Sequence, residues 1–162
     1  MKKLVLALAL AMPLAFAAIA SADAPTIVEQ TLHRSIPHFA ECPGFTVAGE
    51  FDVNRTVMTF VDQNGTPIRR VIHAHFVGML TNTSSGKSIP DEGNQIVTID
   101  LVTGTVTVDG RVRVDTIPGE GVILAQVGRV VTDAQGNILF IAGQQDFATQ
   151  NLSDFCSFMA AP

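Results

Sequence analysis

The sequence predicts an all-β domain: a single small antiparallel β-barrel of about eight strands with a short C-terminal helix, or alternatively a two-sheet β-sandwich. Val, Ile and Thr make up 43 of the 140 residues from position 23 onward, against 6 Leu and 1 Lys. Such β-branched residues fit a pleated sheet, and helix formers are scarce. Short apolar runs alternate with turn signals, and a closed barrel would leave none of their edges exposed.

The first 22 residues have the composition of an export signal. Two lysines (residues 2–3) precede a 16-residue apolar stretch (4–19), and an Ala-Ser-Ala sequence (20–22) gives a cleavage site before Asp23. The apolar stretch is too short to span a membrane comfortably, and no positive charge follows it. We therefore expect a bacterial secreted or extracytoplasmic protein, in a periplasm or at a cell surface, with no stable membrane insertion after signal removal.

The expected organisation is a signal peptide (1–22), an N-terminal extension (23–44) and a β-barrel domain (45–162). Without the signal, the chain carries 8 basic and 15 acidic side chains, a formal charge of −7. An acidic chain without a basic run excludes a nucleic-acid binder that depends on phosphate contacts. The same charge argues against binding to an anionic membrane surface.

Two turn sequences indicate how consecutive strands are connected. The segments 62–65 (Asp-Gln-Asn-Gly) and 133–137 (Asp-Ala-Gln-Gly-Asn) share one design, with Asp at the turn start and Gly at a positive φ. Two hairpins built alike predict an antiparallel meander. Thr103-Gly104 and Asp109-Gly110 are turn signals so close together that one of them is expected to be a bulge. Strands are expected at residues 27–32, 45–53, 56–62, 68–81, 96–102, 105–108, 111–115, 127–132 and 138–142.

Two polar, proline-containing segments are expected to be loops, one at residues 33–44 and one at residues 82–94. Near the C-terminus, residues 152–159 are expected to form a short helix with Asn151 or Ser153 as its N-cap. That helix would carry the second of the two cysteines.

Cys42 and Cys156 are the only cysteines of the chain. An even number of cysteines in an exported protein predicts a disulfide, which here would close a loop of more than a hundred residues. Two free buried thiols are the alternative. A catalytic thiol is not expected, because neither cysteine has a Lys, Arg or His beside it to lower its pKa.

His73 and His75 form the most suggestive cluster for chemistry. Residues two apart on a strand point to the same face, while Ile72, Ala74, Phe76 and Leu80 share the opposite, more apolar face and are the expected core. Two imidazoles can hold a metal at about 2.0–2.1 Å, but no third ligand is apparent, so we expect no metal. The other interpretations are a solvated strand face and a ligand pocket in which both histidines make hydrogen bonds.

Arg129 is the third candidate ligand-binding residue, because it lies among apolar residues of a late strand. Its guanidinium is expected either to pair with a carboxylate or to bind an anionic group of a ligand. Other charged residues share strand faces that are expected to be solvated. These are the pair Glu50 and Asp52 and the pair Arg111 and Arg113.

The stretch GEGVILAQVGRVVTDAQGN (119–137), followed by Ala142-Gly143, resembles a pattern of uncharacterised exported bacterial proteins. At the level of fold, this glycine-rich meander with Gly128-Arg129 on a late strand is similar to the small barrels of allene oxide cyclase and dirigent proteins. The resemblance implies a barrel. It also implies an alternative activity, a cofactor-free isomerase or cyclase whose cavity folds a reactive substrate. It carries no catalytic residue over to this chain.

The chain contains no nucleophile elbow, P-loop, zinc-protease or dinucleotide-binding motif, and we expect no cofactor. The sequence also has no Trp and no Tyr, which argues against a site built on aromatic stacking. We therefore expect a non-enzymatic exported protein that binds a small apolar molecule or makes a surface interaction. The cofactor-free isomerase or cyclase is the alternative.

Overall fold

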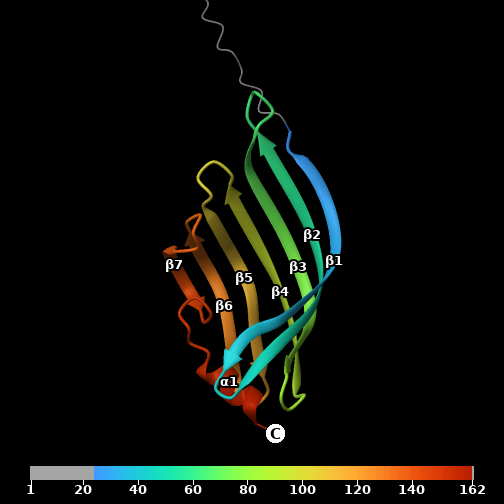
Figure 1. Ribbon diagram of the computed structural model, residues 1–162, viewed down its shortest axis with the longest axis vertical. Helices are drawn as coiled ribbons and strands as arrows, with labels where there is room; N and C mark the ends of the chain where they lie inside the picture. Colours follow the sequence, from blue (N-terminus) through green and yellow to red (C-terminus); the bar gives the residue numbers. More distant parts are fainter. Residues whose placement is uncertain (1–23, 162) are drawn as a thin grey trace, which may run out of the picture.

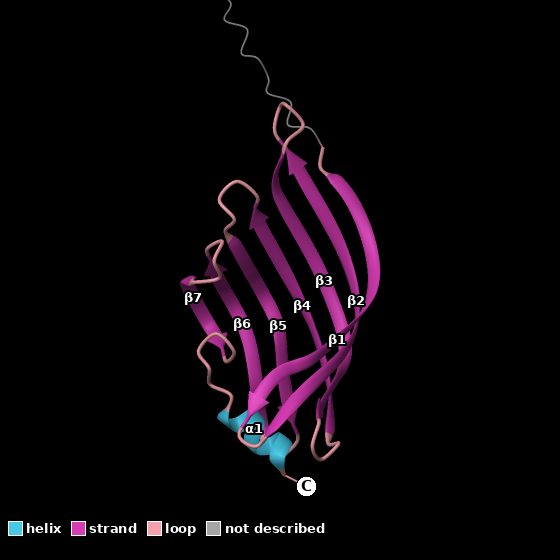
Figure 2. Ribbon diagram, in the orientation of Figure 1, coloured by secondary structure: helices cyan, strands magenta, loops and turns pink. Residues whose placement is uncertain are grey.

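The computed structural model describes residues 24–161, which form one seven-stranded antiparallel sheet and a short helix (Figure 1, Figure 2). Each strand pairs with the next one along the chain, so the sheet is a simple meander. The all-β class and the C-terminal helix are confirmed, whereas the expected signal peptide lies outside the described residues. The elements are β1 (Thr26–Cys42), β2 (Phe45–Val61), β3 (Pro67–Asn82), β4 (Ser88–Asp100), β5 (Val106–Ile117), β6 (Gly121–Thr132), β7 (Ile138–Gln145) and α1 (Ser153–Ala160).

The sheet coils strongly but does not close. Within residues 24–161 no backbone ladder joins β1 to β7, so the closed barrel is not confirmed, and there is one sheet rather than the two of a sandwich. Gly128 and Gly143 lie opposite each other on β6 and β7, with φ of +120° and +84°. A Cβ on either residue would lie 2.1 Å from a backbone carbonyl oxygen of the other strand. Glycine therefore permits the close approach of β6 and β7.

Side chains bridge the free edges of the sheet at the end near α1. The sulfur atoms of Cys42 and Cys156 lie 1.99 Å apart, a disulfide distance, as the sequence predicts. Phe39 of β1 packs edge-on against Phe147, which follows β7, with ring centroids 5.1 Å apart. Figure 1 shows why this contact forms: β1 bends and crosses in front of the sheet toward α1. The bend coincides with a bulge between Ile36 and Ala40.

The prediction of a loop at residues 33–44 is wrong. β1 runs without interruption to Cys42 and pairs with β2 from Thr26 opposite Thr59 to Cys42 opposite Phe45. Its polar composition fits an edge strand, whose outer face meets water and whose second edge has no partner strand. Pro37, which has no N–H to donate, falls inside the bulge, where proline is tolerated.

The loop expected at residues 82–94 is shorter than predicted, because β4 already begins at Ser88. Two pairs of expected strands are also continuous. The expected strands 45–53 and 56–62 fall together in β2, which ends at Val61, and the expected strands 105–108 and 111–115 fall together in β5, which begins at Val106. Gly104, with φ of +75°, lies in the turn before β5, whereas Asp109-Gly110 lies inside β5 and pairs with β6. The real turn was therefore Thr103-Gly104.

The two hairpin turns predicted at residues 62–65 and 133–137 are confirmed in detail. Asp62 Oδ1 accepts hydrogen bonds from the backbone N–H groups of Asn64 and Thr66 at 2.8 and 2.9 Å, and Gly65 has a positive φ. Asp133 Oδ1 accepts two bonds from the equivalent positions, at 2.9 and 2.8 Å. Backbone donors, Thr66 first and Asn64 next, lower the pKa of Asp62. In each turn, the carboxylate of the first residue thus accepts the backbone hydrogen bonds that hold the turn together.

The predicted helix is present as α1, but its predicted cap is wrong. Leu152 is the N-cap, and no side chain caps it. The opposite end of α1 is bound instead: Asn82 Nδ2 donates to the carbonyl oxygen of Met159 at 3.0 Å, and Lys87 Nζ donates to that of Phe158 at 2.6 Å. The turn between β3 and β4 therefore satisfies helix carbonyls that would otherwise lack a donor.

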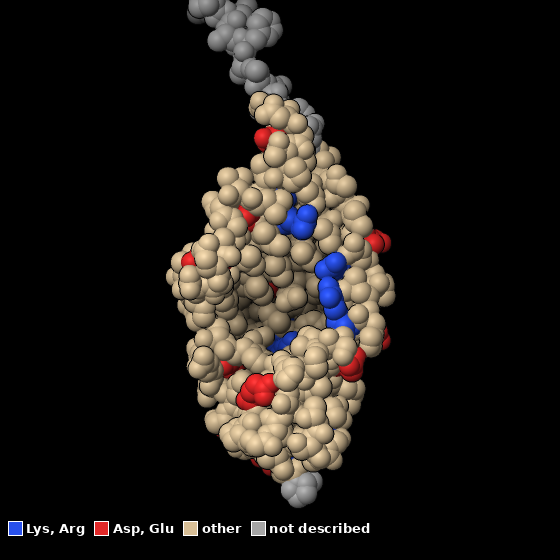
Figure 3. All heavy atoms as spheres, viewed as in Figure 1, with Lys and Arg blue, Asp and Glu red and all other residues tan. Residues whose placement is uncertain are grey.

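The hydrophobic core occupies the half of the inner face that lies near α1. Phe76 and Leu80 of the predicted core face are buried there, together with Phe51 of β2. Phe155 and Met159 of α1 are fully buried against them. The far half of the inner face has no such cover, and Figure 3 shows the molecule hollowed in its middle.

Removing the disulfide should strongly destabilise the fold. We expect the double variant Cys42→Ser, Cys156→Ser to lose about 4–5 kcal/mol in the free energy of unfolding, because the cross-link limits the entropy of a long unfolded loop. Urea unfolding followed by circular dichroism measures the loss. Reduced wild-type protein should match the double variant, and a difference below about 1 kcal/mol from oxidised protein would contradict this role.

Candidate functional site

The open half of the inner face has an apolar wall. One row of mutually paired residues crosses the sheet from β2 to β7, and all its members are half-buried. These side chains share the face of the buried Phe51 and Phe76, so they line the hollow. The row consists of Val57, Ile72, Val97, Val108, Val130 and Ile141.

The next level toward the core carries small residues on β3, β5, β6 and β7, with Arg55 and Gln95 as its larger members on β2 and β4. Ala74 lies opposite Arg55 on β2. Gly110, Gly128 and Gly143 pair with one another across β5, β6 and β7. No bulky side chain projects from these four positions. The hollow therefore extends from the apolar row down to the phenylalanines of the core.

Four of the seven arginines of the chain occupy inner-face positions, on four different strands. Arg34 lies opposite Phe51, Arg55 opposite Ala74, and Arg70 opposite Thr59; the fourth is Arg113. In Figure 3, basic side chains gather around and within the hollow, while acidic ones lie mostly toward its outside. The inner face is therefore basic although the whole chain has a formal net charge of −5.

Three of these arginines have no carboxylate to neutralise them. Within residues 24–161, neither Arg34 nor Arg55 nor Arg70 has an Asp or Glu oxygen within 4.0 Å. Arg55 Nε donates to Gln30 Oε1 at 2.7 Å, so a neutral amide holds it in place. Arg70 Nε is buried without a hydrogen-bond partner. A buried donor of this kind is costly unless something accepts its hydrogen bond.

A buried charged cluster lies at the floor of the hollow. Arg113 Nη1 lies 2.7 Å from Asp91 Oδ2, and the Arg113 side chain is 11% exposed whereas that of Asp91 is 0% exposed. The guanidinium carbon lies 4.6, 5.0, 5.9 and 6.0 Å from the ring centroids of four phenylalanines, which surround it. These are, in that order, Phe39, Phe76, Phe147 and Phe51.

Asp115 completes this floor cluster, defined as Asp91, Arg113 and Asp115. Burial, and next the charge of Asp91, raise the pKa of Asp115 to about 7, although the charge of Arg113 opposes the shift. Burial likewise raises the pKa of Asp91 against the attraction of Arg113. One oxygen of each carboxyl and Nε of Arg113 are buried without a partner. Such a cluster is costly to bury, and perturbed carboxyls beside a cavity are typical of functional sites.

Arg113 is a correction to the sequence interpretation, in which it shared a solvated face with Arg111. A register shift in β5 between Arg111 and Arg113 reverses the alternation of side chains. Arg111 is exposed, whereas Arg113 turns inward. The one signal in the sequence was Asp115 at the same spacing beyond Arg113, an acidic partner on the same strand face.

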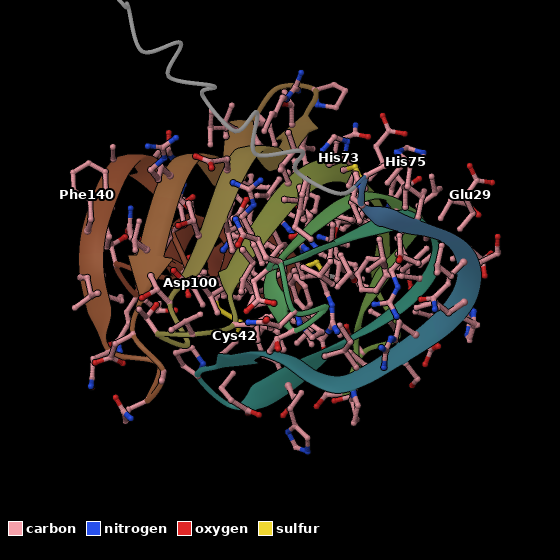
Figure 4. All side chains as sticks on the ribbon, turned by 90° about the horizontal axis from the view of Figure 1, so that it is seen from above. Glu29, Cys42, His73, His75, Asp100 and Phe140 are labelled. Carbon is pink, nitrogen blue, oxygen red and sulfur yellow. A yellow bond between two sulfur atoms is a disulfide. The ribbon has the colours of Figure 1, made fainter. Side chains whose placement is uncertain are left out.

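His73 and His75 lie on the outer face, not in the hollow. Figure 4 shows both pointing away from the curled sheet, on the same side as Glu29. They line an outer groove of about 670 Å³ that crosses β1 to β5, and His75 Nδ1 lies 3.1 Å from Asn94 Oδ1. The groove is lined by Glu29, Gln30, Thr31, Asn54, Arg55, Thr56, His73, Ala74, His75, Asn94, Gln95, Ile96, Asp109, Gly110 and Arg111.

Arg129 also lies on the outer face, where its Nε is 2.5 Å from Asp109 Oδ1. Its partner belongs to the outer groove, so the structure brings His73 and His75 together and places Arg129 at the edge of their surroundings. Of the two interpretations of Arg129, the structure contains the ion pair. An exposed pair of this kind contributes about 0–1 kcal/mol to stability.

The remaining acidic pair is solvated, as expected. Glu50 and Asp52 are exposed and both contact His33, at 2.9 and 3.0 Å. Hydrogen bonds with Asp52 first, and then with Glu50, raise the pKa of His33. In the part of the chain that the structure describes, no three His, Cys, Asp or Glu residues are grouped to hold a metal.

Comparisons with known proteins identify no relative: no family model, no curated protein and no solved structure matches the chain. Between residues 24 and 161, none of the helical segments has the length and hydropathy needed to cross a bilayer. The function must therefore be argued from the geometry of the hollow and its floor cluster.

The raised pKa of Asp115 predicts a pH-dependent stability. Between its ordinary pKa of about 3.9 and about 7, the folded state retains a proton that the unfolded chain releases. The contribution of this proton to the free energy of unfolding is therefore complete below about pH 4, falls as the pH rises to about 7, and does not change further above that pH. We expect the stability of wild type relative to Asp115→Asn to fall by on the order of 3–4 kcal/mol across this range.

Urea unfolding at half-unit pH intervals measures this difference between wild type and Asp115→Asn. Asp52→Asn, an exposed carboxyl on the outer face, is the matched control and should show no comparable slope relative to wild type. Equal pH profiles for wild type and Asp115→Asn would show that Asp115 titrates as an ordinary carboxyl.

Proposed function

We propose that the protein binds a small amphiphilic anion in the hollow of the inner face. The observation that carries this proposal is the set of three inner-face arginines without a carboxylate partner, beside an uncovered apolar wall. Within residues 24–161, no ion pair of the protein uses the charge of these arginines. An organic anion would supply the missing counter-charge and cover the wall at the same time.

The two parts of the ligand use different forces. Its apolar body packs on the Val and Ile row, where buried apolar area contributes about 25 cal/mol per Å². Its anionic group accepts charge-assisted hydrogen bonds, for which the planar guanidinium of arginine is well suited. Arg55 is held by Gln30, so at least this donor needs little reorganisation on binding.

The open side between β1 and β7 is the proposed entrance. A closed barrel of this size would need an opening at one end, whereas here the two edges are not paired and ligand can enter from the side. We further propose that binding occurs outside the cytoplasm. The export-like residues 1–22 and the Cys42–Cys156 disulfide support this location.

A cofactor-free isomerase or cyclase is the second candidate, and one observation favours it. The Asp115 carboxyl, with a pKa of about 7, could transfer protons at neutral pH beside a cavity that holds the substrate. Mass spectrometry of ligand recovered after incubation distinguishes the two functions. A binding protein returns its ligand unchanged, whereas an isomerase returns a product of equal mass with a different retention time.

Removing an inner-face arginine should weaken the binding of an anion. We expect dansylaminoundecanoic acid, a fluorescent carboxylate with an apolar chain, to bind at one saturable site, and Arg55→Gln or Arg70→Gln to lower its affinity about tenfold, since each change removes an unpaired positive charge that attracts the anion. Fluorescence titration at neutral pH and low salt measures the affinity.

Arg69→Gln is the matched control, because Arg69 is the neighbour of Arg70 but faces outward over the Phe60 ring. It should bind the probe like wild type. The uncharged methyl ester of the probe should bind more weakly and equally to all variants. Equal affinity for acid and ester, or equal losses in Arg69→Gln and Arg70→Gln, would contradict the proposed site.

A further inference from the structure

We propose that the hollow binds its organic anion together with one proton: the anionic group docks on Arg113 at the floor, and the Asp91–Asp115 carboxyl pair holds the proton. This inference rests on the proposed function and assigns the direct contact with the anionic group to Arg113, while the unpaired charges of Arg55 and Arg70 attract the anion into the hollow. It also assigns a role to the buried charged cluster, which neither the core nor the apolar wall requires.

The floor cluster leaves part of the Arg113 guanidinium for a ligand. Nη1 is bound to Asp91, and Nε and Asp115 Oδ2 are buried without a partner and have no surface that a ligand could contact. With one proton shared by Asp91 and Asp115, whose side chains hydrogen-bond to each other, the cluster presents the exposed part of this guanidinium and no additional negative charge. A carboxylate or a sulfonate supplies acceptor oxygens for a guanidinium donor.

Arg113 is the member of the cluster that an incoming group can reach. Its side chain remains 11% exposed, whereas Asp91 is completely covered. The four phenylalanine rings around the guanidinium exclude water from it, which strengthens any charge-assisted bond formed there. Arg34, opposite Phe51 on β1, lies at the same level of the sheet and adds positive charge beside this entrance.

The charge of the floor cluster decides whether an anion is attracted. With one proton on the carboxyl pair, the cluster holds one cation and one anion and is neutral. Without that proton, it carries a net negative charge that repels an incoming anion through a medium of low dielectric constant. The anion and the proton therefore favour each other's binding, and this coupling is reciprocal.

The other charged groups near the floor do not replace this proton. Glu92, next to Asp91 on β4, is exposed, and its charge raises the pKa of Asp91, so it favours protonation of the pair. Asp146, beyond β7, is buried, but its Oδ2 accepts a bond from the backbone N–H of Ala125. β2 and β3 contribute Phe51 and Phe76 at this level. The proton thus belongs to Asp91 and Asp115.

The pKa of Asp115, raised to about 7 by burial and then by Asp91, sets the pH at which the coupling becomes visible. At pH 6 the proton is already present before the ligand arrives. Above pH 7 it must be taken up from solution on binding. The affinity for an anion should then fall about tenfold for each unit of pH, as for any ligand whose binding requires one proton.

Decanesulfonate is the probe for the test, because its charge does not change between pH 6 and pH 9. Isothermal titration calorimetry of the full chain gives the affinity at each pH. We expect the affinity of wild type to fall at least tenfold between pH 7 and pH 9, with close to one proton taken up per anion at pH 8.5. Buffers of different ionisation enthalpy measure this uptake.

Asp115→Asn is the decisive variant, because an amide imitates the protonated carboxyl without being able to lose its proton. It should bind decanesulfonate at pH 9 as tightly as wild type does at pH 6, with no proton uptake. Asp52→Asn, on the outer face, is the matched control and should keep the pH dependence of wild type. Circular dichroism confirms that both variants fold.

The outcomes separate the two proposals. No binding of decanesulfonate to wild type at any pH overturns the proposed function, and the proton coupling with it. Binding that is independent of pH in wild type overturns the coupling alone. The coupling is also overturned if folded Asp115→Asn still loses affinity as the pH rises, or if it does not bind at all. It is supported if affinity falls with rising pH in wild type and in Asp52→Asn but not in Asp115→Asn.

Discussion

A sheet that coils without closing has two free edges, and this constraint shapes the rest of the molecule. β1 and β7 are not joined by backbone hydrogen bonds, so other interactions must hold the ends of the chain together. Near α1 this is done by the disulfide and by the contact of Phe39 with Phe147. The core forms at that end because the helix, the bent half of β1 and the segment after β7 converge there. The opposite end lacks these elements, and its inner face remains a hollow.

Charge follows the same division between inner and outer faces. Most acidic side chains are outward or in turns, where water solvates them, whereas four arginines turn inward. Only Arg113 finds a carboxylate there, and it does so in the buried half, where an unpaired guanidinium would be prohibitively costly. Of the other three, Arg34 is exposed to water, Arg55 and Arg70 are half-buried, and Arg70 Nε is buried without a partner. The inner face is therefore basic within a protein whose formal net charge is −5.

Local chemistry made much of the fold predictable. The Asp-Gly turns, the two cysteines and the apolar face of residues 72–80 each specify their structure within a few residues or through covalent pairing. The polar segment 33–44 was not predictable in this way, because an edge strand needs no alternating pattern when only part of one face is covered. Closure was not predictable either, since it depends on the stagger summed over all strands rather than on any one of them.

The candidate site was harder to predict than the fold, because it depends on a single irregularity. Strict alternation in β5 places Arg111 and Arg113 on one face, and only a bulge between them separates an exposed arginine from a buried one. Asp109-Gly110, one of the two signals expected to mark a bulge, directly precedes this register shift, but it does not indicate which of the following residues turn inward. His73 and His75, in contrast, were correctly placed together, because no register shift interrupts β3 between Arg69 and Thr81. A solvated face opposite the expected core was one of the interpretations of this pair, and both histidines are exposed; the sequence did not indicate the groove that surrounds them there.

The curvature of the sheet and the depth of the hollow have the same cause. At Gly128 and Gly143 a side chain would collide with the backbone of the neighbouring strand, so these residues are required by the close approach of β6 and β7. The same two positions would otherwise project side chains into the hollow from the inner face. A sequence able to fill the hollow with larger residues here would have to separate the strands and flatten the sheet. At these two positions, therefore, the close approach of the strands and the absence of a side chain from the hollow have one cause.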